Sequence, residues 1–208
     1  VALGVAIAFV VVRSSIRACG ALDALSMVPL AVPGLVMAFG FLAVSARLTH
    51  WGAMADCEWW ARLVDVRTNP TLFLVLAYSV RRLPYMVRSA VAGLQQTSVA
   101  FEEAAWNMGA SSATTLRRIT LPLILANLIA GTLLTFAFSM LEVSDSLMLA
   151  QQAAYMPITK AIFELFQLLG TGKYVAAALG VWAMAFLATT MVGSSLLLGK
   201  KLGAVFRL

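Results

Sequence analysis

Long apolar segments recur along this chain and restrict it to a small set of folds. Residues 24–46, 71–93, 121–144 and 174–198 are each about long enough to cross a bilayer, and residues 1–12 resemble the end of a further spanning helix. A helix can cross lipid because its backbone hydrogen bonds are all made within the segment. Only 12% of the residues are charged, whereas soluble domains carry about 25%. The sequence therefore predicts an all-α integral membrane protein, a bundle of about five spanning helices.

The chain begins at Val1, inside an apolar run, and no secretory signal with a basic start and a cleavage site is visible in it. We therefore expect residues 1–208 to form one domain whose N-terminal part is missing. Cys19 and Cys57 fall at opposite ends of one predicted span, so we do not expect them to pair. Together with a single histidine, His50, they make no zinc pattern, and we expect no metal site.

The net charge of +6 comes from bases near the ends of the apolar segments, which indicates membrane orientation rather than nucleic-acid binding. If the loop at 94–120 is cytoplasmic, ten bases lie on its side and five on the other. The ten are Arg13, Arg17, Arg81, Arg82, Arg88, Arg117, Arg118, Lys200, Lys201 and Arg207, and the five are Arg47, Arg62, Arg67, Lys160 and Lys173. Arg81 and Arg82 lie deep in their segment, where they would line an internal cavity or snorkel to the surface.

The two segments on the other side differ in character. Residues 47–70 hold three tryptophans, which indicates an aromatic belt at the membrane surface. Residues 145–173 predict a short amphipathic helix with Pro157 in its first turn and Gly170 as its C-terminal cap. Its apolar positions are Ile158, Ile162, Leu165, Phe166 and Leu169.

The loop at 94–120 predicts a short exposed helix followed by a sharp turn. Ser98 is a good N-cap, and Phe101, Ala105 and Met108 form an apolar stripe at i, i+4 and i+7. Gly109 follows where a left-handed C-cap is expected.

Two acids and two further caps complete the prediction for this loop. Glu102 and Glu103 suit the first helical turn and would pair with basic groups of a partner. Ser111 or Ser112 would cap a second short helix, and Pro122 suits the start of the next span. A helix that lies on lipid usually carries bases along its polar face. This segment has none between residues 98 and 112, which favours a protein partner over the lipid surface.

The spacing within this loop resembles a known signature. Its fixed positions are Glu103, Ala104, Ala105, Gly109, Ile119, Leu121 and Pro122. This pattern resembles the cytoplasmic signature of permease subunits of type I, binding-protein-dependent ABC importers. Residues 29–34 and 82–85 resemble the branch that handles ferric iron, phosphonates and related small ions.

The resemblance implies a coupling helix that docks in a groove of a separate ATP-binding subunit. The implied docking residues are Ser98, Phe101, Glu102, Glu103, Ala104, Ala105, Met108, Gly109 and Ala110. The chain has no phosphate-binding loop, so ATP and magnesium would be held by the partner, with no cofactor in this chain. The other implied partners are a second permease copy or homologous half, an external solute-binding protein and the lipid bilayer, in a multi-pass protein of the bacterial plasma membrane.

A polar stripe indicates a candidate translocation pathway. Thr135, Ser139, Glu142 and Ser146 recur at helical spacing, with Asp145 beside them. Buried polar groups in a membrane are costly and often functional. The alternative is that the hydroxyls pack helices and Glu142 lies at the outer interface. The prolines and glycine of residues 29–34 would kink or break the second span, either for a transport route or for packing.

Two other classes of function compete with a permease. An intramembrane enzyme would use Glu142 and Asp145 as an acid pair, or His50 as a base. The sequence has no intramembrane serine–histidine set and no second histidine. The remaining alternative is an exporter or an assembly scaffold. The sequence favours the permease, with no catalytic residue.

Overall fold

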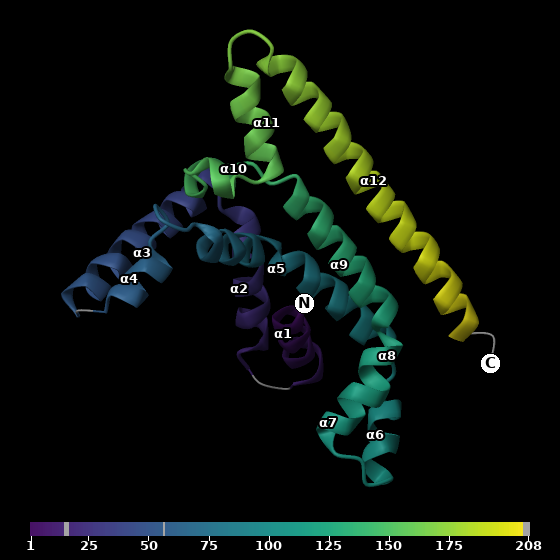
Figure 1. Ribbon diagram of the computed structural model, residues 1–208. Helices are drawn as coiled ribbons and strands as arrows, with labels where there is room; N and C mark the ends of the chain where they lie inside the picture. Colours follow the sequence, from purple (N-terminus) through teal and green to yellow (C-terminus); the bar gives the residue numbers. More distant parts are fainter. Residues whose placement is uncertain (15–16, 56, 206–208) are drawn as a thin grey trace. The chain divides into compact units, whose positions relative to one another are not determined.

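The computed structural model describes residues 1–14, 17–55 and 57–205, with side chains described as far as Leu196. All secondary structure in these residues is helical, which confirms the predicted all-α class (Figure 1). The chain divides into two compact units. The first consists of Val1–Ala31 and Arg82–Phe136, and the second of Val32–Arg81 and Ala137–Leu208.

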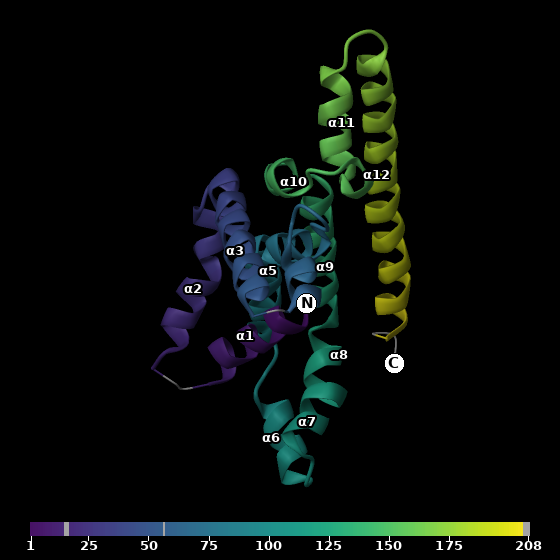
Figure 2. The ribbon, with the colours of Figure 1, turned by 60° about the vertical axis from the view of Figure 1, so that its left-hand side comes forward.

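The first unit is built around the second half of α5 (Thr71–Gln96). Its other helices are α1 (Ala2–Arg13), α2 (Cys19–Ala31), α6 (Ala100–Asn107), α7 (Ser112–Thr115), the π-helix η1 (Leu116–Thr120), α8 (Leu121–Leu123) and most of α9 (Leu125–Met140). Apolar side chains of α1, α5 and the α8–α9 region form its core: Ala8, Met86, Val87, Ala90, Val91, Leu94, Ile124 and Leu128. Figure 2 shows α6 and α7 next to each other in this unit.

Two glycines allow helices of the first unit to approach closely. A Cβ added at Gly4 of α1 would lie 2.8 Å from Cγ of Met86, and one added at Gly131 of α9 would lie 2.6 Å from Cβ of Ser89. Small residues serve this purpose in membrane bundles, where helices associate largely through packing.

The second unit contains α3 (Gly34–Met54), α4 (Glu58–Val64), α10 (Ser144–Leu149), the 3₁₀ turn η2 (Ala153–Tyr155), α11 (Ile158–Gln167) and α12 (Gly172–Val205). Its core is formed by Val64, Val66, Phe73, Leu74, Ala77, Leu149 and Ala150. The predicted amphipathic helix corresponds to α11, which lies beside α12 after a turn at Gly170 (Figures 1 and 2). Gly170 has φ +79° in that turn, but the C-cap of α11 is Leu168, whose backbone is extended with ψ 135°, so the predicted glycine cap does not form at the end of the helix.

The apolar spans agree only partly with their predicted bounds. α3 and residues 172–196 of α12 are each long and apolar enough to cross a membrane, and α1 is a shorter apolar helix. α5 covers the predicted segment 71–93 but carries Arg81, Arg82 and Arg88. Arg207 and the side chains of Lys200 and Lys201 lie outside the described residues.

Two predicted spans are interrupted. The segment 24–46 is not one helix, because α2 ends at Ala31 and α3 begins at Gly34. Pro33 between them has ψ 139°, and proline also disfavours helical backbone in the residue before it. The segment 121–144 is bent, since residues 112–123 and 125–140 meet at 72°. Its helix ends at Met140 rather than at residue 144.

Candidate docking surface and buried charged cluster

The exposed loop of the first unit folds largely as its turn chemistry predicts. Ser98 accepts a hydrogen bond at 3.3 Å from the N–H of Ala100, although the N-cap position itself is occupied by Val99 and not by Ser98. At the other end, Gly109 has φ +83° and the N–H of Ala110 donates to the carbonyl of Ala105 at 3.0 Å. The predicted glycine cap is therefore confirmed, and it closes α6 after only two turns.

The return to the next span follows at once. Ser111 accepts a hydrogen bond from the N–H of Thr114, so Ser111 and not Ser112 caps α7. The backbone then widens into the π-helix η1, where Arg117 and Arg118 are exposed. Pro122 lies at the start of α8, as predicted.

Glu102 does not face a partner, contrary to the prediction. Its side chain is 3% exposed, and Oε1 lies 3.1 Å from Nε of Arg13. Thr120 donates a hydrogen bond to the same oxygen at 3.2 Å. Arg13 also donates to the carbonyl of Thr97 at 3.0 Å. This carboxylate therefore stabilises the inside of the loop.

The outward side of α6, which we call the docking face, consists of Phe101, Glu103, Ala104, Trp106 and Met108. Phe101 is 54% exposed and Met108 is 81% exposed. The predicted apolar stripe is divided, because its middle member, Ala105, is buried. Trp106 was missed, since it falls outside the spacing of that stripe.

The second unit contains a buried cluster centred on Arg81. Nε of Arg81 lies 3.1 Å from Oδ2 of Asp145 and 3.4 Å from Oε2 of Glu142. The three side chains are 11%, 0% and 8% exposed, respectively. Gly34 leaves room for the arginine, because a Cβ at that position would overlap its guanidinium group. Arg81 thus forms internal ion pairs, rather than snorkelling to the surface.

Glu142 also organises the start of α10. Its Oε1 accepts a hydrogen bond from the N–H of Ser144 at 3.0 Å, while its backbone carbonyl accepts from the hydroxyls of Ser146 and Thr159. Anionic groups are favoured at this end of a helix, where the backbone N–H groups are unpaired.

The predicted pathway residues do not form one stripe on one helix. Thr135 and Ser139 lie on α9, Glu142 lies in the turn that follows it, and Asp145 lies on α10. The structure brings Glu142 and Asp145 together on Arg81.

Lys160 of α11 is buried at the other end of α10. Its Nζ donates to the carbonyls of Ala150 at 2.6 Å and Leu147 at 3.3 Å, and it lies 3.8 Å from Glu164. A cation suits the C-terminal end of a helix. In the sequence, the one sign that Lys160 is buried is its position among the apolar residues of α11.

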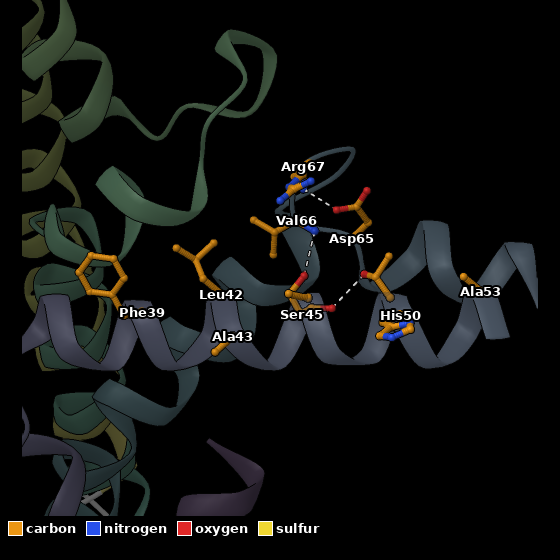
Figure 3. Close-up of a pocket in the computed structure, with 11 residues that line it drawn as sticks. Phe39, Leu42, Ala43, Ser45, His50, Ala53, Asp65, Val66 and Arg67 are labelled. Atoms are coloured by element: carbon orange, nitrogen blue, oxygen red, sulfur yellow. Dashed lines mark hydrogen bonds between the residues drawn. The ribbon is translucent and has the colours of Figure 1, made fainter. Parts of the chain in front are cut away.

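A cavity of about 670 Å³ lies along α3 in the second unit. Figure 3 shows its lining, in which Phe39, Leu42 and Ala43 contribute apolar side chains. The hydroxyl of Ser45 donates to the carbonyl of Val64 and accepts from the N–H of Val66. These hydrogen bonds connect α3 to residues 64–66 beside the cavity. His50 lies on the lining. Within the described residues, no group of three or more His, Cys, Asp or Glu side chains is placed to hold a metal ion.

Comparison with known proteins gives a family match over nearly the whole chain. The family described as "Binding-protein-dependent transport system inner membrane component" matches residues 1–194.

Three relatives illustrate the range of similarity. The molybdenum transport system permease protein ModB of Mycobacterium tuberculosis is 32% identical over 150 residues, which cover 72% of this chain and 55% of that protein. A probable molybdenum ABC transporter permease protein of Haloferax volcanii is 32% identical over 159 residues, or 76% and 55% of the two chains. A probable sulfate transport system permease protein cysT of Chlorella vulgaris is 27% identical over 161 residues, or 76% and 57%. The chain thus spans a little over half the length of these relatives.

Proposed function

Because the chain belongs to the family of inner membrane components of binding-protein-dependent transport systems, we propose that it is the permease part of an importer for a small oxyanion such as molybdate or sulfate. The family match over residues 1–194 carries this proposal. The relatives are named as transport permeases, which confirms the prediction of a permease rather than an enzyme.

The predicted iron and phosphonate branch is not supported. The relatives are named for molybdenum and sulfate transport. A tetrahedral oxyanion is the substrate class that follows from those names.

The proposed assembly keeps the partners that the resemblance implied. Residues 1–208 form one transmembrane domain in the bacterial plasma membrane, with the loop at 94–120 in the cytoplasm. A separate ATPase subunit binds ATP and magnesium and docks on α6, while a second permease half and an external binding protein complete the importer. The exposed Phe101 and Met108 support docking, since apolar side chains that fill a partner's pocket supply much of an interface's binding energy.

The pathway proposal retains Thr135 and Ser139 on α9, with Glu142 and Asp145 beside the route. An uncompensated carboxylate would repel an oxyanion at close range. Arg81 compensates one of these two negative charges and so reduces the repulsion that an anion would meet near the buried acids.

Docking on α6 predicts a specific loss of the ATPase subunit. Phe101→Asp and Met108→Asp should each weaken its binding roughly 30-fold or more, because each places a charge where an interface needs an apolar contact. Co-purification of the tagged permease with the ATPase subunit measures this loss. Phe166→Asp is the matched control, because Phe166 is 69% exposed on α11 and should leave the ATPase bound. Full binding by both α6 variants would rule out docking at this face.

The substrate class is tested separately, in proteoliposomes that contain the permease, the ATPase subunit and the binding protein. We expect saturable, ATP-dependent uptake of radiolabelled molybdate or sulfate, with excess ferric iron or methylphosphonate failing to compete. The reason is that the proposed class is defined by the charge and tetrahedral shape of an oxyanion. Uptake of iron or phosphonate alone would contradict the assignment.

A further inference from the structure

Glu102 lies on the docking helix but faces the interior of the first unit. α6 has eight residues, fewer than an isolated helix needs for stability in water. Its buried residues are Glu102 and Ala105. The orientation of α6 therefore depends strongly on what the carboxylate of Glu102 binds.

The bonds around this carboxylate join four parts of the chain. Arg13 belongs to the last turn of α1, Thr97 to the segment between α5 and α6, and Thr120 to η1. The carboxylate accepts from Arg13 and Thr120, while Arg13 also donates to the carbonyl of Thr97. The segment before α6 therefore bonds Arg13 directly through Thr97, whereas Thr120 after α6 bonds the carboxylate of Glu102 that Arg13 also binds.

The ion pair between Arg13 and Glu102 connects α6 to α1, although the two helices are not neighbours along the backbone. Along the backbone, α6 connects to α5 on one side and to α7 on the other. Arg13 and Glu102 are 89 residues apart in sequence. Charge-assisted hydrogen bonds are short and directional, and they are stronger in a buried site than in water. A displacement of α6 is therefore resisted at Arg13 as well as along the backbone.

We infer that Glu102 and Arg13 are a positioning pair that carries movement of the docking helix to α1, a role that rests on the proposed docking of an ATPase subunit. In this assignment the two neighbouring acids have different roles. Glu103 lies on the docking face and contributes to binding the ATPase subunit. Glu102 makes the bound helix move together with α1.

The test uses Glu102→Gln in the complete transporter, with molybdate or sulfate as the probe, whichever the unaltered protein takes up. The ATPase subunit should still co-purify and hydrolyse ATP, while uptake per ATP hydrolysed should fall roughly 2- to 30-fold. Glu103→Gln is the matched control on the same helix. It should weaken co-purification and lower uptake and hydrolysis together, with their ratio unchanged.

Further variants separate positioning from simple misfolding. Arg13→Gln should lower the same ratio, and the double variant with Glu102→Gln should lose no more than the worse single variant, because both remove one interaction. Thr120→Val keeps both charges and should reduce the ratio by a smaller factor. If Glu102→Gln fails to accumulate in the membrane, Thr120→Val and Arg13→Gln provide the test.

The outcomes distinguish the inference from the function on which it rests. An unchanged ratio in these variants, or additive losses in the double variant, would overturn the positioning role. Loss of co-purification in Glu102→Gln would also overturn it, since Glu102 would then belong to the docking surface. If the unaltered chain binds no ATPase subunit, the proposed function itself fails.

Discussion

Replacing Arg81 by methionine should lower the free energy of unfolding by about 3–5 kcal/mol. The variant leaves Glu142 and Asp145, which are 8% and 0% exposed, without the guanidinium group that lies between them. Removing one partner of a buried ion pair costs more than the pair itself contributes, because an uncompensated charge stays buried. Thermal or denaturant unfolding of the purified protein in detergent measures the change.

The control for Arg81 is an ion pair of the same chemistry at the surface. Arg62 and Glu58 on α4 are 3.1 Å apart, with side chains 79% and 84% exposed. Arg62→Met should therefore cost at most about 0.5 kcal/mol. Adding Glu142→Gln and Asp145→Asn to Arg81→Met should restore part of the lost stability, since the two carboxylates that Arg81 binds are then neutral as well. Equal unfolding of the Arg81 and Arg62 variants would contradict a structural role for the cluster.

Replacing Lys160 by methionine should destabilise the protein by about 2–3 kcal/mol. Methionine fits the space but donates no hydrogen bond, so the carbonyls of Leu147 and Ala150 at the end of α10 lose their donor. The favourable contact of a cation with the C-terminal end of that helix is lost as well. Differential scanning measurements on the detergent-solubilised protein would report the change as a lower unfolding temperature.

The matched variant is Lys173→Met, which removes an exposed lysine at the start of α12. Its Nζ lies over the ring of Tyr174 at 5.1 Å, a surface contact worth about 0.5–1 kcal/mol. Lys160→Arg keeps the charge and should retain part of the stability. An unfolding temperature for Lys160→Met no lower than that for Lys173→Met would show that the buried ammonium group stabilises nothing.

The sequence predicted well where structure depends on neighbouring residues. The left-handed turn at Gly109, the serine cap before α7 and the proline at the start of α8 all follow from local backbone chemistry. Segment 24–46 shows the limit of this reasoning. Its prolines and glycine indicated a kink or a break, but its apolar composition led us to predict a single span. In the structure, α2 ends before Pro33 and α3 begins after it.

The candidate site was predicted less completely, because helical spacing does not say which face of a short helix turns inward. Glu102 and Glu103 are adjacent acids with the same intrinsic chemistry, yet one is buried and the other is exposed. Likewise, the expected polar stripe assumed that one helix continues through residue 146, whereas α9 ends at Met140.

The sequence by itself determined that this chain forms membrane helices and that residues 98–122 form a turn-capped exposed loop, since both depend on hydrophobicity and on contacts within a few residues. The tertiary structure alone decided which charges meet. Arg13 pairs with Glu102 across 89 residues of sequence, and Arg81 with Asp145 across 64. Such pairs form because a buried charge needs a partner, and only the folded chain places one within reach.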